Sequence, residues 1–155
     1  MRDALLKFKF HDRADYADAL AAFIADEVTR RFVGRYDMMT WVPVSPKRKK
    51  ERGYDQAMLL AEATALRLGT VAVSALEKTR HTDANSSLDA ARRAENVKGA
   101  YKVTAPELVA GKRVLLIDDI FTTGATMKEC AATLRDAGAH EVIGAAVAAA
   151  RPERE

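Results

Sequence analysis

The residues with the clearest chemical pattern are 114–126, which read VLLIDDIFTTGAT. A short aliphatic run, typical of a central strand buried on both faces, leads into Asp118 and Asp119 and then into a turn rich in Thr and Gly. We expect this turn to open a helix, whose N-terminal N–H groups and positive dipole end attract a phosphate. The two acids would accept hydrogen bonds from the vicinal hydroxyls of a sugar. The pattern therefore predicts a ribose 5-phosphate site at the carboxyl edge of a parallel sheet.

The turn itself supplies the candidate phosphate ligands. Its backbone N–H groups and Thr hydroxyls would face the phosphate, and its glycine lets the backbone approach closely. The candidate residues are Thr122, Thr123, Gly124, Ala125 and Thr126. In the alternative interpretation, the acids only end a strand and Thr123 only caps a helix. No Walker A sequence and no G-x-G-x-x-G competes with this segment elsewhere in the chain.

A second candidate segment is strongly basic. It places five cations within six residues, beside the single acid Glu51, although the net charge of the whole chain is only +3. The five are Lys47, Arg48, Lys49, Lys50 and Arg52. A charge run of this kind is usually a solvated turn, but this one follows an expected strand and so shares the sheet edge of the acids. That location favours an anionic ligand.

Residues 114–126 resemble the signature of type I phosphoribosyltransferases, which bind 5-phosphoribosyl 1-diphosphate. Two further segments are similar to the ComF/GntX branch of that family (competence protein F-like, amidophosphoribosyltransferase-like): residues 42–56, VPVSPKRKKERGYDQ, match its first loop, and residues 80–101, RHTDANSSLDAARRAENVKGAY, match its flexible loop. The chain departs from the pattern at Asp55, where Asn is usual, and at Asn85, where Gln is usual. It also lacks the N-terminal four-cysteine zinc module of many relatives.

The resemblance implies transfer of the phosphoribosyl group to an unidentified nucleophile, with diphosphate as the leaving group. Asp118 and Asp119 would be the catalytic residues. They would hold the ribose hydroxyls and help to place Mg²⁺, a cation that keeps waters and bridges substrate phosphates. Thr122 stands where enzymes that act on 6-oxopurines carry an acid, which weakens an interpretation as a purine-salvage enzyme.

The same resemblance assigns cations to the leaving group. Lys47, Arg48 and Arg52 would bind the diphosphate. Arg80 and Arg93 belong to the flexible loop, residues 80–98, which we expect to be a hairpin lid that excludes water from the reaction. A mobile hairpin without that role is the alternative.

A second hypothesis treats the fold as a non-catalytic module that senses 5-phosphoribosyl 1-diphosphate or binds single-stranded DNA. The association of the ComF family with natural transformation suggests DNA and DNA-uptake proteins as partners, and the basic segment could follow a phosphate backbone. Single-stranded DNA is bound by stacking bases on aromatic side chains, and Tyr54 is the one aromatic residue interleaved in the basic segment. The sequence therefore favours this hypothesis less.

The elements that must position these residues alternate between strands and helices. The alternation predicts an α/β fold with a central, mainly parallel, twisted sheet flanked by helices. Helices are expected over residues 12–32, 55–68 and 127–137, and strands over 38–44, 71–76, 100–103, 113–117 and 141–149. Residues 78–99 form a long loop in this scheme, and 100–103 return to pair with 73–79. Residues 1–35 would be a small helical hood over a core of residues 36–150, within one domain of residues 1–155.

Composition agrees with one globular domain. Of the 155 residues, 48% are hydrophobic and 30% are charged, so the chain has enough apolar side chain for a core. The single cysteine, Cys130, excludes an intrachain disulfide framework. The longest apolar run, residues 142–150, is too short for a membrane span, which needs about 20 residues. We expect a cytoplasmic protein without a membrane partner and, because type I relatives are commonly dimers, a homodimer.

Overall fold

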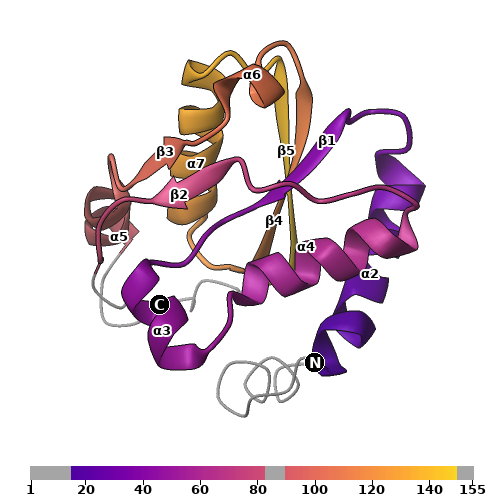
Figure 1. Cartoon of the computed structure of the whole chain (residues 1–155), viewed down its shortest axis with the longest axis horizontal. Coiled ribbons are helices and arrows are strands. Elements are labelled where there is room, and N and C mark those ends of the chain that lie inside the picture. The colour runs from indigo at the N-terminus through magenta and orange to yellow at the C-terminus, as the bar shows by residue number, and fades with distance from the viewer. Residues whose placement is uncertain (1–14, 83–89, 150–155) are drawn as a thin grey trace.

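A parallel three-stranded sheet in the order β1–β4–β5 forms the centre of the computed structural model, which describes residues 15–82 and 90–149. Its strands are β1 (Met38–Trp41), β4 (Arg113–Phe121) and β5 (Glu141–Ala149). A separate antiparallel hairpin pairs β2 (Leu76–Lys78) with β3 (Tyr101–Val103). Figure 1 shows the hairpin beside the sheet, on the side of α7. The architecture confirms the expected α/β fold and the returning strand.

Helices cover both faces of the sheet. They are α2 (Asp15–Arg31), α3 (Pro46–Arg52), α4 (Gln56–Arg67), α5 (Ala90–Val97), α6 (Pro106–Val109) and α7 (Ala125–Asp136). The helices α2 and α4 pack together on one side, whereas α7 lies on the other side with the hairpin and α5 (Figure 1). None of the helices among the described residues combines the length and the apolar character that a membrane crossing requires.

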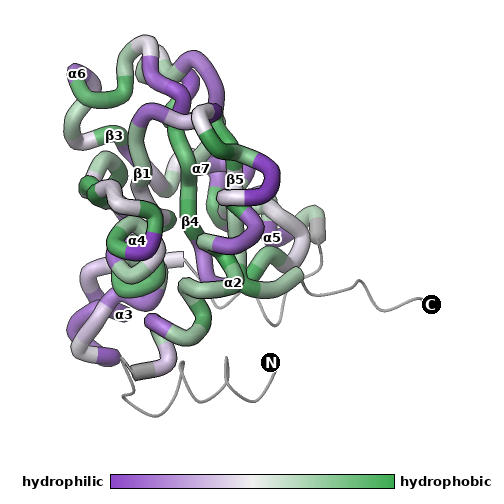
Figure 2. Tube along the Cα trace, turned by 90° about the vertical axis from the view of Figure 1, so that its right-hand side faces the viewer, coloured by the Kyte–Doolittle hydropathy of each residue, from purple (hydrophilic) through white to green (hydrophobic). Residues whose placement is uncertain are grey.

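The central strand β4 separates two apolar clusters. Leu115 and Ile117 belong to the cluster built with α2 and α4, and Val114 and Leu116 belong to the cluster built with α7 and the hairpin. All four side chains have no exposed surface. The hydrophobic path of β4 runs through the middle of the molecule in Figure 2. The strand is thus buried on both faces, as its aliphatic sequence predicts.

A clamp at the start of β1 fixes the register of the sheet. The carboxylate of Asp37 accepts hydrogen bonds from the backbone N–H of Arg113 at 2.8 Å and from its guanidinium at 2.7 and 3.1 Å. The backbone N–H of Asp37 donates in turn to the carbonyl of Arg113 at 2.8 Å. The parallel pairing that follows places Met38 beside Val114 and Trp41 beside Ile117. The hydrogen bonds from Arg113 hold the pKa of the Asp37 carboxyl well below its usual range.

Three expected strands have different bounds. The strand expected at 38–44 ends at Trp41. The backbone N–H of Val42 still donates to the carbonyl of Ile117, but Pro43 has no N–H with which to continue the pairing. The strand at 113–117 runs on to Phe121, so the two acids lie inside it. The strand expected at 71–76 is reduced to an isolated bridge between Ala72 and Met39.

Two connections also differ from expectation. The long loop at 78–99 contains the helix α5, which a period-based prediction misses because Val97 is its one large buried side chain. The short helix α6 was not expected either. Within the expected hood, residues 15–31 form α2, which packs against α4 and β5. The division into hood and core stays a prediction. Residues 1–14, with the expected cap Asp12, lie outside the described residues.

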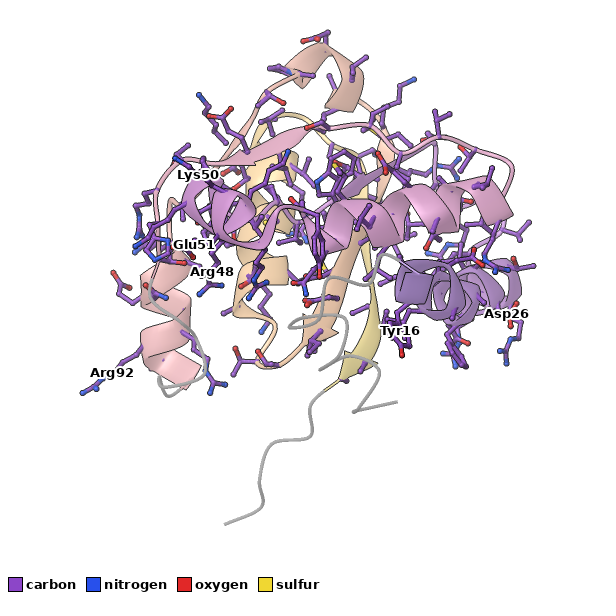
Figure 3. All side chains as sticks on the ribbon, turned by 60° about the horizontal axis from the view of Figure 1, so that its bottom comes forward. Tyr16, Asp26, Arg48, Lys50, Glu51 and Arg92 are labelled. Atoms are coloured by element: carbon purple, nitrogen blue, oxygen red, sulfur yellow. The ribbon has the colours of Figure 1, made fainter. Side chains whose placement is uncertain are left out.

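Replacing Asp37 by Asn is expected to lower the stability of the fold at neutral pH, because one amide oxygen cannot accept all the bonds that the carboxylate accepts. The pKa of Asp37 is depressed in the folded state, so its contribution is complete above the unfolded value near 3.8 and is lost as pH falls below it. Thermal unfolding should therefore separate wild type from Asp37→Asn most at neutral pH and progressively less below about pH 4. Asp26→Asn is the matched control, because Asp26 lies exposed on the outer side of α2 (Figure 3). A difference that does not change between pH 7 and pH 3 would contradict the clamp.

Candidate functional site

Two half-buried acids form the carboxyl end of β4. Asp118 lies opposite Ala146 of β5, and its Oδ1 accepts from the backbone N–H of Asp119 at 2.8 Å. The Oδ1 of Asp119 accepts from the N–H of Ile120, also at 2.8 Å. Each carboxylate is thus held against the backbone N–H of the residue that follows it. These contacts fix where the two acids sit at the edge of the sheet.

The expected phosphate loop follows the acids directly. Gly124 adopts the left-handed conformation, with φ +76°, and is the N-cap of α7. Its carbonyl accepts from the N–H of Lys128 at 2.8 Å, and the hydroxyl of Thr123 accepts from the N–H of Ala125 at 3.4 Å. A Cβ at Gly124 would overlap the ring of Phe121. The left-handed φ therefore favours glycine here, and an added Cβ would also force the exposed Phe121 ring to move. The loop places the beginning of a 12-residue helix next to the acids.

The side chains of the loop differ in exposure. Thr122 is exposed, whereas Thr123, Ala125 and Thr126 are half-buried and Gly124 is buried. The structure thus brings all five predicted loop residues and both acids together in one continuous segment, from the end of β4 into the first turn of α7.

The basic segment is a helix, not the turn or loop that the sequence suggested. The hydroxyl of Ser45 caps α3 by accepting from the N–H of Arg48 at 3.4 Å, Pro46 occupies its first turn, and Gly53 ends it with φ +80°. The helix divides the cations, because Lys47, Lys49 and Lys50 are exposed while Arg48 and Arg52 are half-buried. Figure 3 shows Arg48, Lys50 and Glu51 on this helix. Only the two arginines are therefore partly enclosed by the protein.

Asp55 anchors this segment to the core. It is 4% exposed, and its two oxygens accept from the backbone N–H groups of Val44 and Met58, each at 3.2 Å. The contact with Met58 confirms Asp55 as the cap of α4. Burial raises the pKa of the Asp55 carboxyl. Beside it, the guanidinium of Arg52 donates to the Oε1 of the buried Gln56 at 2.6 Å. These contacts join the end of β1, the helix α3 and the start of α4.

A half-buried lysine on β2 was not found from the sequence. The Nζ of Lys78 donates to the hydroxyl of Thr82 at 2.7 Å and lies 5.4 Å from the centre of the Tyr101 ring. Burial, with help from the nearby Arg48, lowers the pKa of Lys78 to about 8, although Asp118 opposes the change. Strand alternation was the available signal, because Lys78 lies two residues after the buried Leu76 and so shares its face.

Both ends of the expected flexible loop are tied to the body. The guanidinium of Arg80 donates to the carbonyl of Lys98 at 2.9 Å, and His81 Nδ1 lies 3.2 Å from the hydroxyl of Ser45. At the far end, the N–H of Gly99 donates to Glu129 of α7 at 2.7 Å. Residues 83–89 lie outside the described residues.

The two arginines of α5 have different environments. Arg93 is half-buried, whereas Arg92 is exposed and points away from the body of the molecule in Figure 3. Arg93 is therefore the better placed of the two for a role at the site, and that role stays a prediction.

The carboxylates of this site suit a metal ion whose remaining ligands come from the substrate and from water. Within residues 15–82 and 90–149, no three side chains of His, Cys, Asp or Glu gather as a metal cage. Asp118 and Asp119 offer two neighbouring carboxylates, which are the oxygen donors that Mg²⁺ prefers when substrate phosphates and water complete its shell. The acids at the end of β4 fit such an ion.

Comparison with known sequences matches a family model to the part of the chain that contains the acids and the phosphate loop. A family model described as "Phosphoribosyl transferase domain" matches residues 55–155, which include β4, the phosphate loop and α7. The DNA utilization protein YhgH of Salmonella typhimurium is 34% identical over 141 residues, which are 88% of this chain and 61% of that protein. The competence protein ComFC of Streptococcus pneumoniae is 31% identical over 144 residues, 92% of this chain and 60% of its own. The chain thus spans about three fifths of the length of these relatives.

Comparison with solved structures supports the fold. The glutamine phosphoribosylpyrophosphate amidotransferase of Bacillus subtilis has a TM-score of 0.60 and 21% identity, and it covers 92% of this chain and 30% of its own. An allosteric regulatory enzyme of purine biosynthesis has a TM-score of 0.61 and 22% identity over the same shares. The likeness shows that this chain has the type I phosphoribosyltransferase fold.

Replacing Gly124 by Ala is expected to disrupt the phosphate loop. Gly111→Ala is the matched control, because Gly111 has a similar φ of +72° but no atom within 4 Å of an added Cβ. The left-handed conformation alone should cost each variant about 1 to 2 kcal/mol. The overlap with Phe121 should make the free energy of unfolding of Gly124→Ala fall further than that of Gly111→Ala in urea denaturation. Equal losses would mean that the close approach at Gly124 is not tight.

Proposed function

The chain belongs to the phosphoribosyl transferase domain family, in its ComF-like branch, and from this premise we propose that it is a Mg²⁺-dependent enzyme that binds 5-phosphoribosyl 1-diphosphate and transfers its phosphoribosyl group. The observation that carries the proposal is the continuous segment in which two half-buried acids on β4 run directly into the Gly124 loop at the start of α7. A phosphate site and a diol site next to one another suit a ribose 5-phosphate.

The protein would hold the ribose 5-phosphate by two sets of contacts, one to its phosphate and one to its hydroxyls. The N–H groups around Gly124 and the hydroxyls of Thr123 and Thr126 would hold the 5′-phosphate, where the helix dipole favours negative charge. Asp118 and Asp119 would accept hydrogen bonds from the 2′- and 3′-hydroxyls. Because each carboxylate is already held by a backbone N–H, little reorganisation would be needed when the sugar arrives.

Cations near the acids would receive the diphosphate. Arg48, half-buried on α3, is the best placed of the basic residues, and Lys47 would contribute from the exposed rim. Arg52 donates to Gln56, so it would also hold the helix in position. Asp118 and Asp119 would help to hold Mg²⁺ together with the substrate diphosphate, and the ion would supply positive charge to offset that of the leaving group.

The reaction would be a substitution at the anomeric carbon with inversion. The bond from C1 to the diphosphate oxygen breaks, the acceptor forms a bond to C1 on the opposite face, and the electron pair leaves with diphosphate. The enzyme would contribute mainly positioning and charge stabilisation. Thr122 supplies no carboxylate at this position, so a base that takes a proton from the acceptor would have to come from elsewhere or from the acceptor itself.

A second candidate function rests on the exposed side of α3. Relatives of this chain are called a DNA utilization protein and a competence protein, which favours a link to DNA uptake. Three lysines, Lys47, Lys49 and Lys50, are exposed on that helix and could follow the backbone of single-stranded DNA. In this alternative, the sugar diphosphate site is a non-catalytic sensor.

Changing both Asp118 and Asp119 to Asn should weaken binding of 5-phosphoribosyl 1-diphosphate by about a hundredfold or more, because hydrogen bonds to charged groups are worth about 1.5 to 3 kcal/mol each. Calorimetric titration with Mg²⁺ measures the loss, and a chelator should cause a similar loss in wild type. Asp136→Asn, an exposed carboxylate at the far end of α7, is the matched control. Unchanged affinity in the folded double variant would reject the proposed site.

Changing Lys49 and Lys50 to Gln separates the two functions. If the exposed side of α3 binds DNA, the variant should bind an oligothymidine more weakly, and the slope of log affinity against log salt should become shallower by about one to two units. Its affinity for 5-phosphoribosyl 1-diphosphate should stay the same, because both lysines are exposed and neither is assigned to the diphosphate. The absence of any salt-dependent DNA binding by wild type would exclude the second candidate.

A further inference from the structure

Three cations lie where the residues after β2 meet the start of α3, because His81 Nδ1 lies 3.2 Å from the hydroxyl of Ser45, the N-cap of α3. Arg48 comes from α3, Lys78 from the end of β2, and Arg80 from the residues that follow it. Burial is the main cause of the lowered pKa of Lys78, and the positive charges of Arg48 and Arg80 add to it. Asp118 is the carboxylate that acts in the opposite direction. Like charges held together cost free energy unless an anion offsets them.

The position of the Lys78 ammonium is fixed by its neighbours. The hydroxyl of Thr82 accepts one of its N–H donors at 2.7 Å, and Thr82 is itself 4% exposed. The ring of Tyr101, which is opposite Lys78 in the hairpin, lies below the ammonium. An ammonium has three donors, so this arrangement orients the group and leaves it able to donate further.

The same cluster lies beside the sugar site. The ring of Tyr101, 5.4 Å from the Lys78 ammonium, belongs to the same apolar cluster as Leu116 of β4 and Met127 of α7. Ala125 of the phosphate loop packs against this cluster, so Lys78 lies on the side of the sheet where that loop begins. In agreement, the charge of Asp118 opposes the lowering of the Lys78 pKa. A diphosphate attached to C1 of a sugar bound at Asp118 would have to extend past this group of residues. The negative charge of the diphosphate would offset the repulsion among the three cations.

We propose that Lys78 is a binding residue for the leaving diphosphate, reaching it from β2 while Arg48 reaches it from α3. This inference rests on the proposed function and adds a residue that the sequence pattern of the site did not contain. Thr82 is a positioning residue in this scheme, because it acts only through the ammonium that it holds. The competing explanation is that the stem of Lys78 only covers Tyr101, as long cationic side chains often cover aromatic rings.

The test measures inorganic diphosphate with Mg²⁺ and ribose 5-phosphate separately, by calorimetry, on wild type and Lys78→Met. Methionine keeps the covering stem and removes the charge. We expect diphosphate to bind about tenfold or more weakly to Lys78→Met, while ribose 5-phosphate binds as it does to wild type. Lys102→Met is the matched control on the same hairpin, because Lys102 is exposed and pairs with Glu77 at 2.9 Å. Thr82→Val should give a smaller loss for diphosphate only.

The outcomes separate this inference from the proposed function. Equal affinity of wild type and Lys78→Met for diphosphate overturns the role of Lys78, as does a wild type that binds ribose 5-phosphate but no diphosphate. A wild type that binds neither compound overturns the proposed function together with this inference. If Lys78→Met does not fold, acetylation of wild type at pH 8 followed by mass spectrometry decides the question. Diphosphate, but not ribose 5-phosphate, should slow the modification of Lys78 and leave Lys102 unaffected, and equal rates with and without diphosphate overturn the role of Lys78.

Discussion

The burial of β4 on both faces is the constraint on which the rest of the structure depends. Four consecutive side chains, Val114 to Ile117, have no exposed surface and alternate between two separate apolar clusters. If β4 shifted by one residue, the side chains that face one cluster would face the other, and Asp118 would enter an apolar environment. The acids are therefore held near the carboxyl edge of the sheet, a few residues before the Gly124 loop and α7.

The other side of the site is assembled from segments distant in the sequence, and buried polar contacts join them. Asp55 connects the end of β1 to α4, while Ser45 caps α3 and contacts His81 at the root of the expected lid. Glu129 links α7 to the end of α5 through Gly99. The helix that begins at the phosphate loop thus also holds one end of the segment expected to close over the ligand. The cations near Lys78 repel one another, and the free energy of burying the apolar core must offset that cost until an anion binds.

Sequence reasoning succeeded where a local rule was sufficient. The strands around 113–117 and 141–149, the cap at Asp55, and the acids followed by a Thr/Gly turn all follow from short-range pattern, and each is present. It failed where tertiary contacts replace a local rule. The hydroxyl of Thr40 accepts from the N–H of Ala75 at 3.3 Å, so a side chain takes the place of the ladder that a regular strand over 71–76 would need. In α5, a single buried valine is enough for packing on α7 but gives no readable period.

By itself, the sequence determined the α/β class, the position of β4 and the chemistry at its end, because a doubly buried strand and a glycine-dependent turn impose their residue types directly. Tertiary structure decided which cations belong to the site. The five basic residues within 47–52 are equivalent in the sequence, but the helix α3 leaves Arg48 and Arg52 half-buried and the three lysines exposed. Lys78 carries no local signal beyond strand alternation. Its ammonium is held at Tyr101 and Thr82 because β2 pairs with β3, which packs against α7, and such non-local pairing cannot be deduced from the order of residues alone.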